Sequence, residues 1–132
     1  MMKFNNVYVI DDDKIFHFIV QKLFNRNQIE VELSFFQNGH EAIEDIKEKL
    51  DCDDPLPDLI LLDINMPILD GWQFLEEYQQ LKEKFESEPE IYLISSSDNI
   101  LDTAKAKEFD DVIKKYLLKP IRRADIEAIF TN

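Results

Sequence analysis

The stretch "DLILLD", residues 58–63, is the most apolar strand-like segment of the chain, and it ends on an acid. Four consecutive aliphatic residues indicate a strand that is buried on both faces, because a strand with one wet face would alternate apolar and polar residues. Strands of this kind occupy the centre of parallel sheets that are covered by helices. We therefore expect residues 58–63 in the middle of such a sheet, with Asp63 at its carboxyl end.

The rest of the chain alternates strand-like and helix-like segments. Strands are predicted over 7–10, 29–36, 58–63, 90–97 and 116–118, and helices over 14–27, 42–50, 72–85, 98–109 and 121–131. The helix over 14–27 is expected to bury a broad apolar stripe that includes Ile15 and Ile19. Strands that alternate with helices predict a parallel sheet with helices on both faces. The expected fold is α/β: a doubly wound five-stranded parallel sheet, (βα)5, with the flavodoxin-like strand order 2-1-3-4-5.

Length and composition indicate a single domain. The 132 residues fit one domain of about 100–200 residues, and 45% of them are hydrophobic, including ten Phe. The predicted elements account for residues 1–132, so we expect one domain and no output domain.

The net charge limits the classes of partner, and the cysteine content indicates the compartment. A net charge of -13 disfavours nucleic acid and anionic membranes, and it favours neutral or basic protein partners. The single Cys52 cannot form an internal disulfide and fits a reducing compartment. No segment has the composition of a signal peptide, and no apolar run reaches the roughly 18 residues of a membrane span. The expected location is cytoplasmic.

Four of the five predicted strands end in groups that can bind a metal ion or a phosphate. These are Asp11-Asp12-Asp13, Asp63, Ser95-Ser96-Ser97 and Lys119-Pro120. Each has an ordinary explanation when taken alone: a helix start, a turn, a helix cap or the end of a strand. Ligands of open parallel sheets bind at the carboxyl ends of the strands, however, and four such ends on one rim favour a binding site.

The charges at this rim complement one another. Asp11, Asp12 and Asp63 are expected to lie close together, because the first and third strands are neighbours in the predicted order. Three adjacent carboxylates repel and need a positive partner, which a Mg²⁺ ion with its preference for oxygen ligands can supply. We expect Lys119 to supply a second positive charge and to face Asp63. Pro120 turns the chain directly behind Lys119, and a cis bond is accessible at low cost there.

Four segments closely resemble the response-regulator receiver domain, in the same order along the chain. They are "VIDDD" (9–13), "LLDINMPILDG" (61–71), "YLISSS" (92–97) and "YLLKP" (116–120). The resemblance implies a stand-alone response regulator of two-component, or phosphorelay, signal transduction. It also implies that Asp63 accepts the phosphoryl group.

The resemblance implies a magnesium site beside the acceptor. Asp12 would bind Mg²⁺ directly, and Asp11 would act mainly through water. Asp63 and the backbone carbonyl of Asn65 would complete the site.

The resemblance further implies residues that respond to phosphorylation, and a set of partners. Ser95 and Lys119 would contact the phosphoryl group, and Tyr116 would be the switch aromatic. The donor would be a histidine kinase or a histidine phosphotransfer protein, and the signal would pass to an unknown downstream protein. We expect no enzyme activity beyond self-catalysed phosphorylation and dephosphorylation. A terminal effector and a relay intermediate both fit, as do a monomer and a phosphorylation-dependent dimer.

The sequence departs from the usual receiver pattern in places, and other classes of protein fit parts of it. Ser95 stands where threonine is commoner, and "FDDVIKKY" (109–116) replaces the usual turn of small residues. A haloacid-dehalogenase-like phosphatase also uses an aspartate at a strand end, but it needs a second aspartate at the position of Asn65. A phosphorylation-independent interaction module is the third possibility, although none of the key residues is missing. An EF-hand calcium loop is disfavoured by the spacing.

Overall fold

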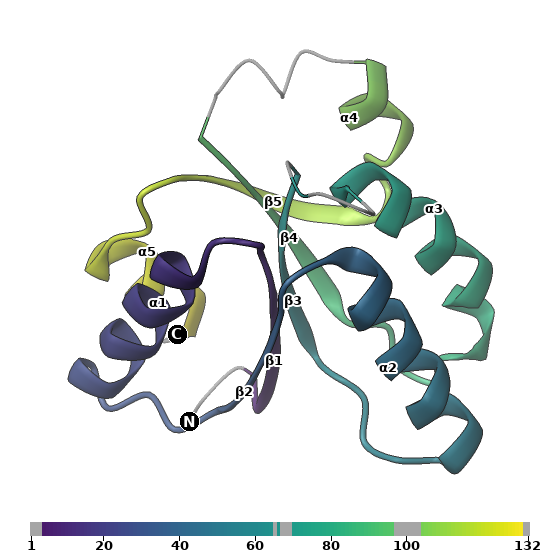
Figure 1. Ribbon diagram of the computed structural model, residues 1–132, viewed down its shortest axis with the longest axis horizontal. Helices are drawn as coiled ribbons and strands as arrows, with labels where there is room; N and C mark the ends of the chain where they lie inside the picture. The colour runs from purple at the N-terminus through teal and green to yellow at the C-terminus, as the bar shows by residue number, and fades with distance from the viewer. Residues whose placement is uncertain (1–3, 65, 67–69, 97–103, 131–132) are drawn as a thin grey trace.

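The computed structural model describes residues 4–64, 66, 70–96 and 104–130. They contain a sheet of β1 (Asn6–Ile10), β2 (Glu32–Phe36), β3 (Leu59–Asp63), β4 (Glu90–Ser95) and β5 (Ile113–Leu118). Every neighbouring pair is parallel, and the order is β2-β1-β3-β4-β5 (Figure 1). The predicted doubly wound sheet is therefore confirmed.

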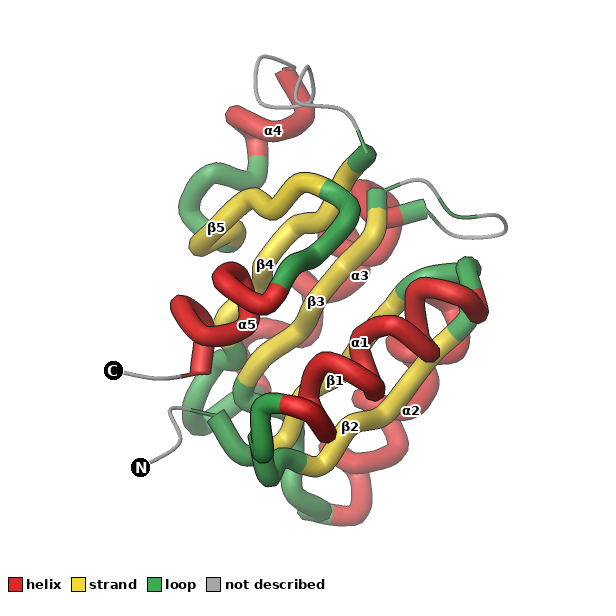
Figure 2. Tube along the Cα trace, turned by 90° about the vertical axis from the view of Figure 1, so that its left-hand side faces the viewer, coloured by secondary structure: helices red, strands yellow, loops and turns green. Residues whose placement is uncertain are grey.

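Helices cover both faces of the sheet. They are α1 (Lys14–Arg26), α2 (Gly39–Cys52), α3 (Gly71–Leu81), α4 (Ala104–Glu108) and α5 (Arg123–Phe130), with a short 3-10 turn, η1 (Lys82–Lys84), after α3. In Figure 2, α1 and α5 lie in front of the strands, and α2 and α3 lie behind them. Among the described residues, no helix combines the length and the apolar character that crossing a membrane requires.

Side-chain alternation along the strands divides the core into two clusters. On β1, Tyr8 and Ile10 join the cluster under α2 and α3, whereas Val7 and Val9 join the cluster under α1 and α5. All of β3 is buried, as predicted for the central strand. Full burial of each aliphatic side chain contributes roughly 1.5–3 kcal/mol relative to exposure, so the middle of the sheet is the rigid part of the molecule.

The apolar stripe of α1 is narrower than predicted. Phe16, Val20 and Phe24 are buried, but Ile15 is 69% exposed and Ile19 is 39% exposed. The three buried residues are spaced four apart and form one row along the helix. A helix that lies on a sheet contacts it along such a row, so apolar residues beside the row stay in water.

Some helices and strands begin or end at other residues than predicted, because sequence propensity does not fix the ends of secondary-structure elements. β5 begins at Ile113, three residues before the predicted start. Lys114 and Lys115 are exposed within it, which an edge strand tolerates. The strand predicted over 29–36 forms only from Glu32. Of the helix predicted over 98–109, the structure describes Ala104–Glu108.

The helices that follow β1 and β3 begin at side-chain caps on the rim where these strands end. The Asp13 carboxylate accepts a hydrogen bond from Ile15 N at 2.9 Å and caps α1, which confirms Asp13 as a helix start. Asp70 caps α3 in a capping box: it accepts from Gln73 N at 2.9 Å, and the Gln73 side chain accepts from Asp70 N at 2.9 Å. These caps fix the first turns of both helices beside the carboxyl ends of β1 and β3.

Gly71 brings the start of α3 directly against the end of β3. Its N–H donates to Ile64 O at 2.9 Å. A Cβ atom at this position would lie 2.8 Å from Asp63 O and 2.8 Å from the Ile64 Cα. Both are backbone atoms, so they cannot rotate away, and only glycine fits without a backbone shift.

We predict that Gly71→Ala lowers the free energy of unfolding by about 1–3 kcal/mol, the usual cost of overpacking. The measurement is urea denaturation followed by circular dichroism. Gln80→Ala, at an exposed position of the same helix, is the matched control and should leave stability nearly unchanged. Equal stabilities of the two variants would show that the contact between α3 and β3 is not tight.

Candidate functional site

Three carboxylates meet at the carboxyl ends of β1 and β3. Asp11, Asp12 and Asp63 each place a carboxylate oxygen within 4.8 Å of the others. Asp11 and Asp63 are buried, with exposures of 0% and 5%, whereas Asp12 is exposed. The cluster is therefore open to solvent on the side of Asp12 and closed on the side of the core.

Backbone contacts hold Asp11 and Asp63 in place. The Asp11 N–H donates to Phe36 O at 3.0 Å at the end of β2, and the Asp11 Oδ1 accepts from Asp13 N at 2.9 Å. Asp63 is the last residue of β3 and pairs in register with Ile94 of β4. Both carboxylates are thus fixed by the sheet itself.

Lys119 supplies the positive charge, and its nearer partner is Asp11. The Lys119 Nζ lies 2.7 Å from Asp11 Oδ2 and 3.9 Å from Asp63 Oδ2. Sequence reasoning expected this lysine to face Asp63, and the structure places it between the two acids. The Lys119–Pro120 bond is cis, the conformer that the sequence made accessible.

The pKa of Lys119 shows which effect dominates at the site. Burial lowers the pKa of this lysine, because a buried ammonium loses hydration. The hydrogen bond to Asp11 and the charges of Asp63, Asp11 and Asp13 outweigh that loss, and the pKa lies above its ordinary value. Lys119 therefore remains an ammonium ion throughout the neutral range.

Sequence reasoning missed one contact of this lysine. The Lys119 Nζ lies 4.7 Å from the centre of the Phe16 ring, within the range of a cation–π interaction. The helical periodicity marked Phe16 only as a core residue. The sequence did contain a signal for this contact. Phe16 lies three residues after the cap residue Asp13, in the first turn of α1, and this position places the Phe16 ring at the rim.

Ser95 and Tyr116 lie on β4 and β5, the two strands next to Lys119. Ser95 ends β4, is 3% exposed, and its backbone carbonyl accepts from Lys119 N at 2.8 Å. Tyr116 is half-buried on β5, and its hydroxyl lies 3.5 Å from Ala106 O of α4. Burial and then the charge of Asp110 raise the pKa of Tyr116, so the hydroxyl stays protonated and can donate.

Two predicted site features fall outside the part of the chain that the structure describes. They are the carbonyl of Asn65 and the serine at position 97. Met66, next to the predicted carbonyl ligand, is buried in the core cluster under α3.

The donor set fits a divalent cation that prefers oxygen. Three carboxylates converge, which suits Mg²⁺ or Mn²⁺ better than a metal that prefers thiolate or imidazole. The exposed Asp12 leaves room for the waters that Mg²⁺ retains. The arrangement can hold a metal cation beside the buried Asp63 carboxylate, which also lies near the Lys119 ammonium.

Comparison with known proteins identifies the family. The family model of the response regulator receiver domain matches residues 7–131. A two-component response regulator from Cytophaga hutchinsonii has a similar solved structure, with a TM-score of 0.81 and 28% identity, covering 96% of this chain and 94% of that one.

Two curated relatives show the range of proteins that carry this unit. Hybrid signal transduction histidine kinase L of Dictyostelium discoideum is 31% identical over 123 residues, which are 93% of this chain but 7% of that protein. Chemotaxis protein CheY of Bacillus subtilis is 25% identical over 115 residues, 85% of this chain and 87% of CheY. The family match, the shared sheet and the acidic rim agree, and the chain belongs to the response regulator receiver domain family of two-component signalling.

Proposed function

We propose that this receiver accepts a phosphoryl group on the Asp63 carboxylate in a Mg²⁺-dependent reaction and signals by a change of its own surface. The observation that carries the proposal is the position of the Lys119 ammonium between Asp11 and Asp63. A nucleophilic carboxylate must be ionised, and a cation beside it favours the ionised form. The same cation is placed to balance the added charge of a phosphoryl group.

The contacts of Asp11 support separate roles for the two acids of β1. Asp11 Oδ1 accepts a backbone hydrogen bond, and Asp11 Oδ2 faces the Lys119 ammonium. Both oxygens are thus engaged, so we assign Asp11 to water-mediated contact with the metal. The exposed Asp12 and the acceptor Asp63 would bind Mg²⁺ directly, together with the carbonyl of Asn65. When bound, Mg²⁺ supplies positive charge to the oxygens of the transferring group.

The transfer forms one bond and breaks one bond. An oxygen of the Asp63 carboxylate attacks the phosphorus, and the bond from phosphorus to the imidazole nitrogen of a phosphohistidine breaks. The leaving imidazole takes up a proton. Lys119 and the Ser95 hydroxyl would contact the equatorial oxygens of the transferred group. A water molecule later attacks the phosphorus, which restores the carboxylate and releases inorganic phosphate.

The surface beside the site supports a protein as the phosphoryl donor. α1 exposes Phe18 by 59%, next to the exposed Ile15 and Ile19. A pocket of about 290 Å³ continues this apolar surface to the rim, lined by Asp13, Phe16, Ile19, Lys119, Pro120 and Ile121. Monomeric proteins seldom leave such apolar side chains grouped without a partner. We propose that a histidine kinase or a histidine phosphotransfer protein contacts this face.

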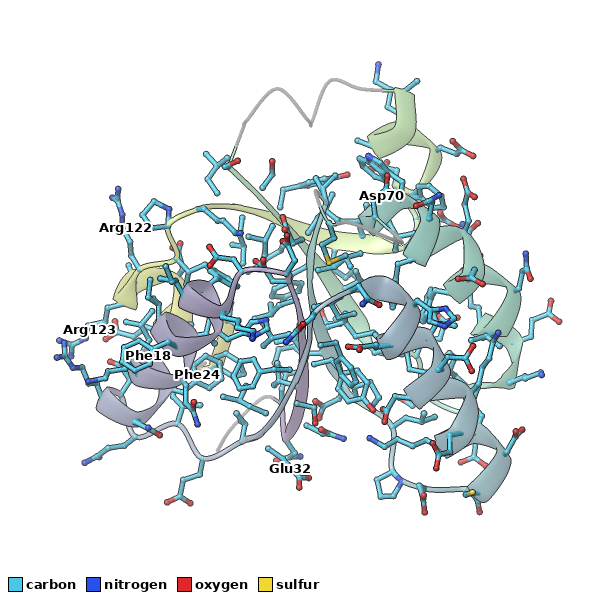
Figure 3. The ribbon with its side chains drawn as sticks, viewed as in Figure 1. Phe18, Phe24, Glu32, Asp70, Arg122 and Arg123 are labelled. Carbon is cyan, nitrogen blue, oxygen red and sulfur yellow. The ribbon has the colours of Figure 1, made fainter. Side chains whose placement is uncertain are left out.

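The charge of α1 also departs from that of the whole chain. α1 carries Lys14, Lys22 and Arg26 and no acid, whereas the chain has a net charge of -13. The Lys22 Nζ lies 5.2 Å from the Phe18 ring centre. Figure 3 shows Phe18 on the same side of the view as Arg123 of α5. A donor protein with an acidic surface would therefore approach this side without the repulsion that it meets elsewhere.

The output would pass through Ser95 and Tyr116. A phosphoryl group on Asp63 would draw the Ser95 hydroxyl toward it and open space into which the Tyr116 ring can turn. The Tyr116 hydroxyl would then leave Ala106 O, a contact that is already long at 3.5 Å. The surface of α4, β5 and α5 would change for a downstream protein or for a second receiver.

A phosphatase of the haloacid-dehalogenase type is not favoured. The family match is to a receiver domain, and the residue two positions after Asp63 is Asn65, which cannot act as the general acid of that class.

We predict that Asp63→Asn abolishes the phosphate adduct, because an amide is not a nucleophile at phosphorus. The protein is incubated with acetyl phosphate and Mg²⁺, and its intact mass is measured. Asp54→Asn, in an exposed loop between α2 and β3, is the matched control and should gain the adduct. An undiminished adduct in Asp63→Asn would assign the acceptor to another residue.

Asp12→Ala should weaken Mg²⁺ binding by roughly tenfold or more, which corresponds to 1.4 kcal/mol or more of binding free energy. The same change relieves repulsion among the carboxylates, so the metal-free protein should become more stable. Titration calorimetry measures the affinity, and thermal unfolding without metal measures the stability. Asp54→Ala is the control, and an affinity equal to that of the control would remove Asp12 from the metal site.

Lys119→Gln should lower the free energy of unfolding in metal-free buffer by about 1–3 kcal/mol, because the buried Asp11 carboxylate loses its cation. The pKa of Lys119 is raised in the folded protein, so its stabilisation is complete below the ordinary lysine pKa and disappears only as the pH rises through the folded value. The deficit should therefore persist at neutral pH.

Urea denaturation at about pH 7, followed by circular dichroism, measures the deficit. Lys114→Gln removes the same charge from an exposed site on β5 and is the control. If the two variants lose equal stability, Lys119 does not balance the acidic cluster.

A further inference from the structure

The rings of Trp72 and Phe109 stack between α3 and α4. Their centroids lie 6.0 Å apart, and their planes are inclined by 15°. Trp72 is the second residue of α3, and Phe109 directly follows α4. Phe109 is 1% exposed, whereas Trp72 is partly exposed at the edge of the core. The stack therefore joins the helix that begins at the acceptor strand to the helix that the proposed switch moves.

Trp72 is held near Asp63 by the contacts of its chain neighbour Gly71 with the end of β3. Gly71, its neighbour in the chain, donates to Ile64 O at 2.9 Å and has no room for a Cβ atom against Asp63 O. The capping box of Asp70 and Gln73 fixes the first turn of α3. A backbone displacement at the end of β3 therefore moves the start of α3, because close-packed contacts transmit strain.

The Phe109 side is tied to β5. The Phe109 carbonyl accepts hydrogen bonds from Val112 N at 2.9 Å and Ile113 N at 3.0 Å, where β5 begins. Tyr116 contacts α4 at a different residue, through Ala106 O at 3.5 Å. Tyr116 of β5 and Trp72 of α3 thus contact this region at two different places, the Ala106 carbonyl within α4 and the Phe109 ring directly after it.

We propose that the Trp72–Phe109 stack is a second mechanical link between Asp63 and α4, which acts independently of Ser95 and Tyr116. The link regulates the same site and rests on the proposed phosphorylation of Asp63. Charge added at Asp63 shifts the end of β3, Gly71 carries the shift into Trp72, and the change of the stack repositions Phe109 at the base of α4. An aromatic pair transmits such a shift because its favourable geometries are few.

The test uses beryllofluoride with Mg²⁺ as the mimic of the phosphoryl group. Amide NMR shifts of residues 104–108 report on α4, and the fluorine signal of the bound mimic reports on occupancy of the site. The chain has one tryptophan, so the indole N–H signal of Trp72 reports on the stack without ambiguity. The variants are Tyr116→Ala, Phe109→Leu, Trp72→Leu and the double variant Tyr116→Ala with Phe109→Leu.

With the mimic bound, we expect the Trp72 indole signal to shift in the wild type and in Tyr116→Ala. The shifts of α4 should decrease in Tyr116→Ala, decrease in Phe109→Leu, and disappear in the double variant, because losses through independent routes add. Trp72→Leu changes a partly exposed residue and should reproduce Phe109→Leu. This agreement separates a lost link from a damaged core, and circular dichroism confirms that each variant is folded.

Three results would overturn the proposal. One is a Trp72 signal that stays fixed when the fluorine signal shows full occupancy. Another is an α4 response that vanishes completely in Tyr116→Ala alone. The last is an α4 response in Phe109→Leu and Trp72→Leu equal to that of the wild type, in which case the stack is ordinary core packing. A wild-type protein that binds no mimic and gains no adduct would instead refute phosphorylation of Asp63, and with it the link.

Discussion

The acidic rim depends on the Lys119 ammonium. Asp11 and Asp63 are buried, and two buried carboxylates at close range repel each other unless a cation lies beside them. Lys119 lies 2.7 Å from one and 3.9 Å from the other. The strand order makes this possible, because it sets β1 beside β3 and returns the chain through β5 to the same rim. Three carboxylates and one ammonium leave a net negative charge at the rim, which a divalent metal ion would balance.

The molecule separates a rigid part from parts that can respond. β3 is buried along its whole length, and β1 and β4 are buried after their first residues. Polar side chains collect at the carboxyl ends, where a local change costs little core packing. The contacts that lead away from Asp63 differ in strength. The Gly71 backbone is packed without space, whereas the Tyr116 hydroxyl makes only a long contact to α4. Elements with few strong contacts are the ones that move at low cost.

The strands and the residues at their ends were predictable because apolar runs are local patterns, and the strand order was predicted from the usual order of doubly wound sheets. It did not predict that Lys119 lies nearer Asp11 than Asp63, since that depends on how the chain turns after β5. It also assigned Ile15 and Ile19 to the core, where the structure exposes both. Helical periodicity shows that a face is apolar, but it does not show whether the sheet or a partner covers each residue. The stacking of Trp72 on Phe109 was not predicted either, because the two residues are distant in the chain and their contact depends on the tertiary fold.

The most direct test of the account locates the phosphoryl group chemically. The wild-type protein is treated with acetyl phosphate and Mg²⁺, reduced with borohydride, digested and analysed by tandem mass spectrometry. Borohydride reduces an aspartyl phosphate to homoserine and leaves free carboxylates unchanged, so the reacting residue is marked in place. We predict homoserine at position 63, and its loss when a chelator removes the metal. Homoserine at another aspartate, or equal labelling of position 63 with the chelator present, would contradict it.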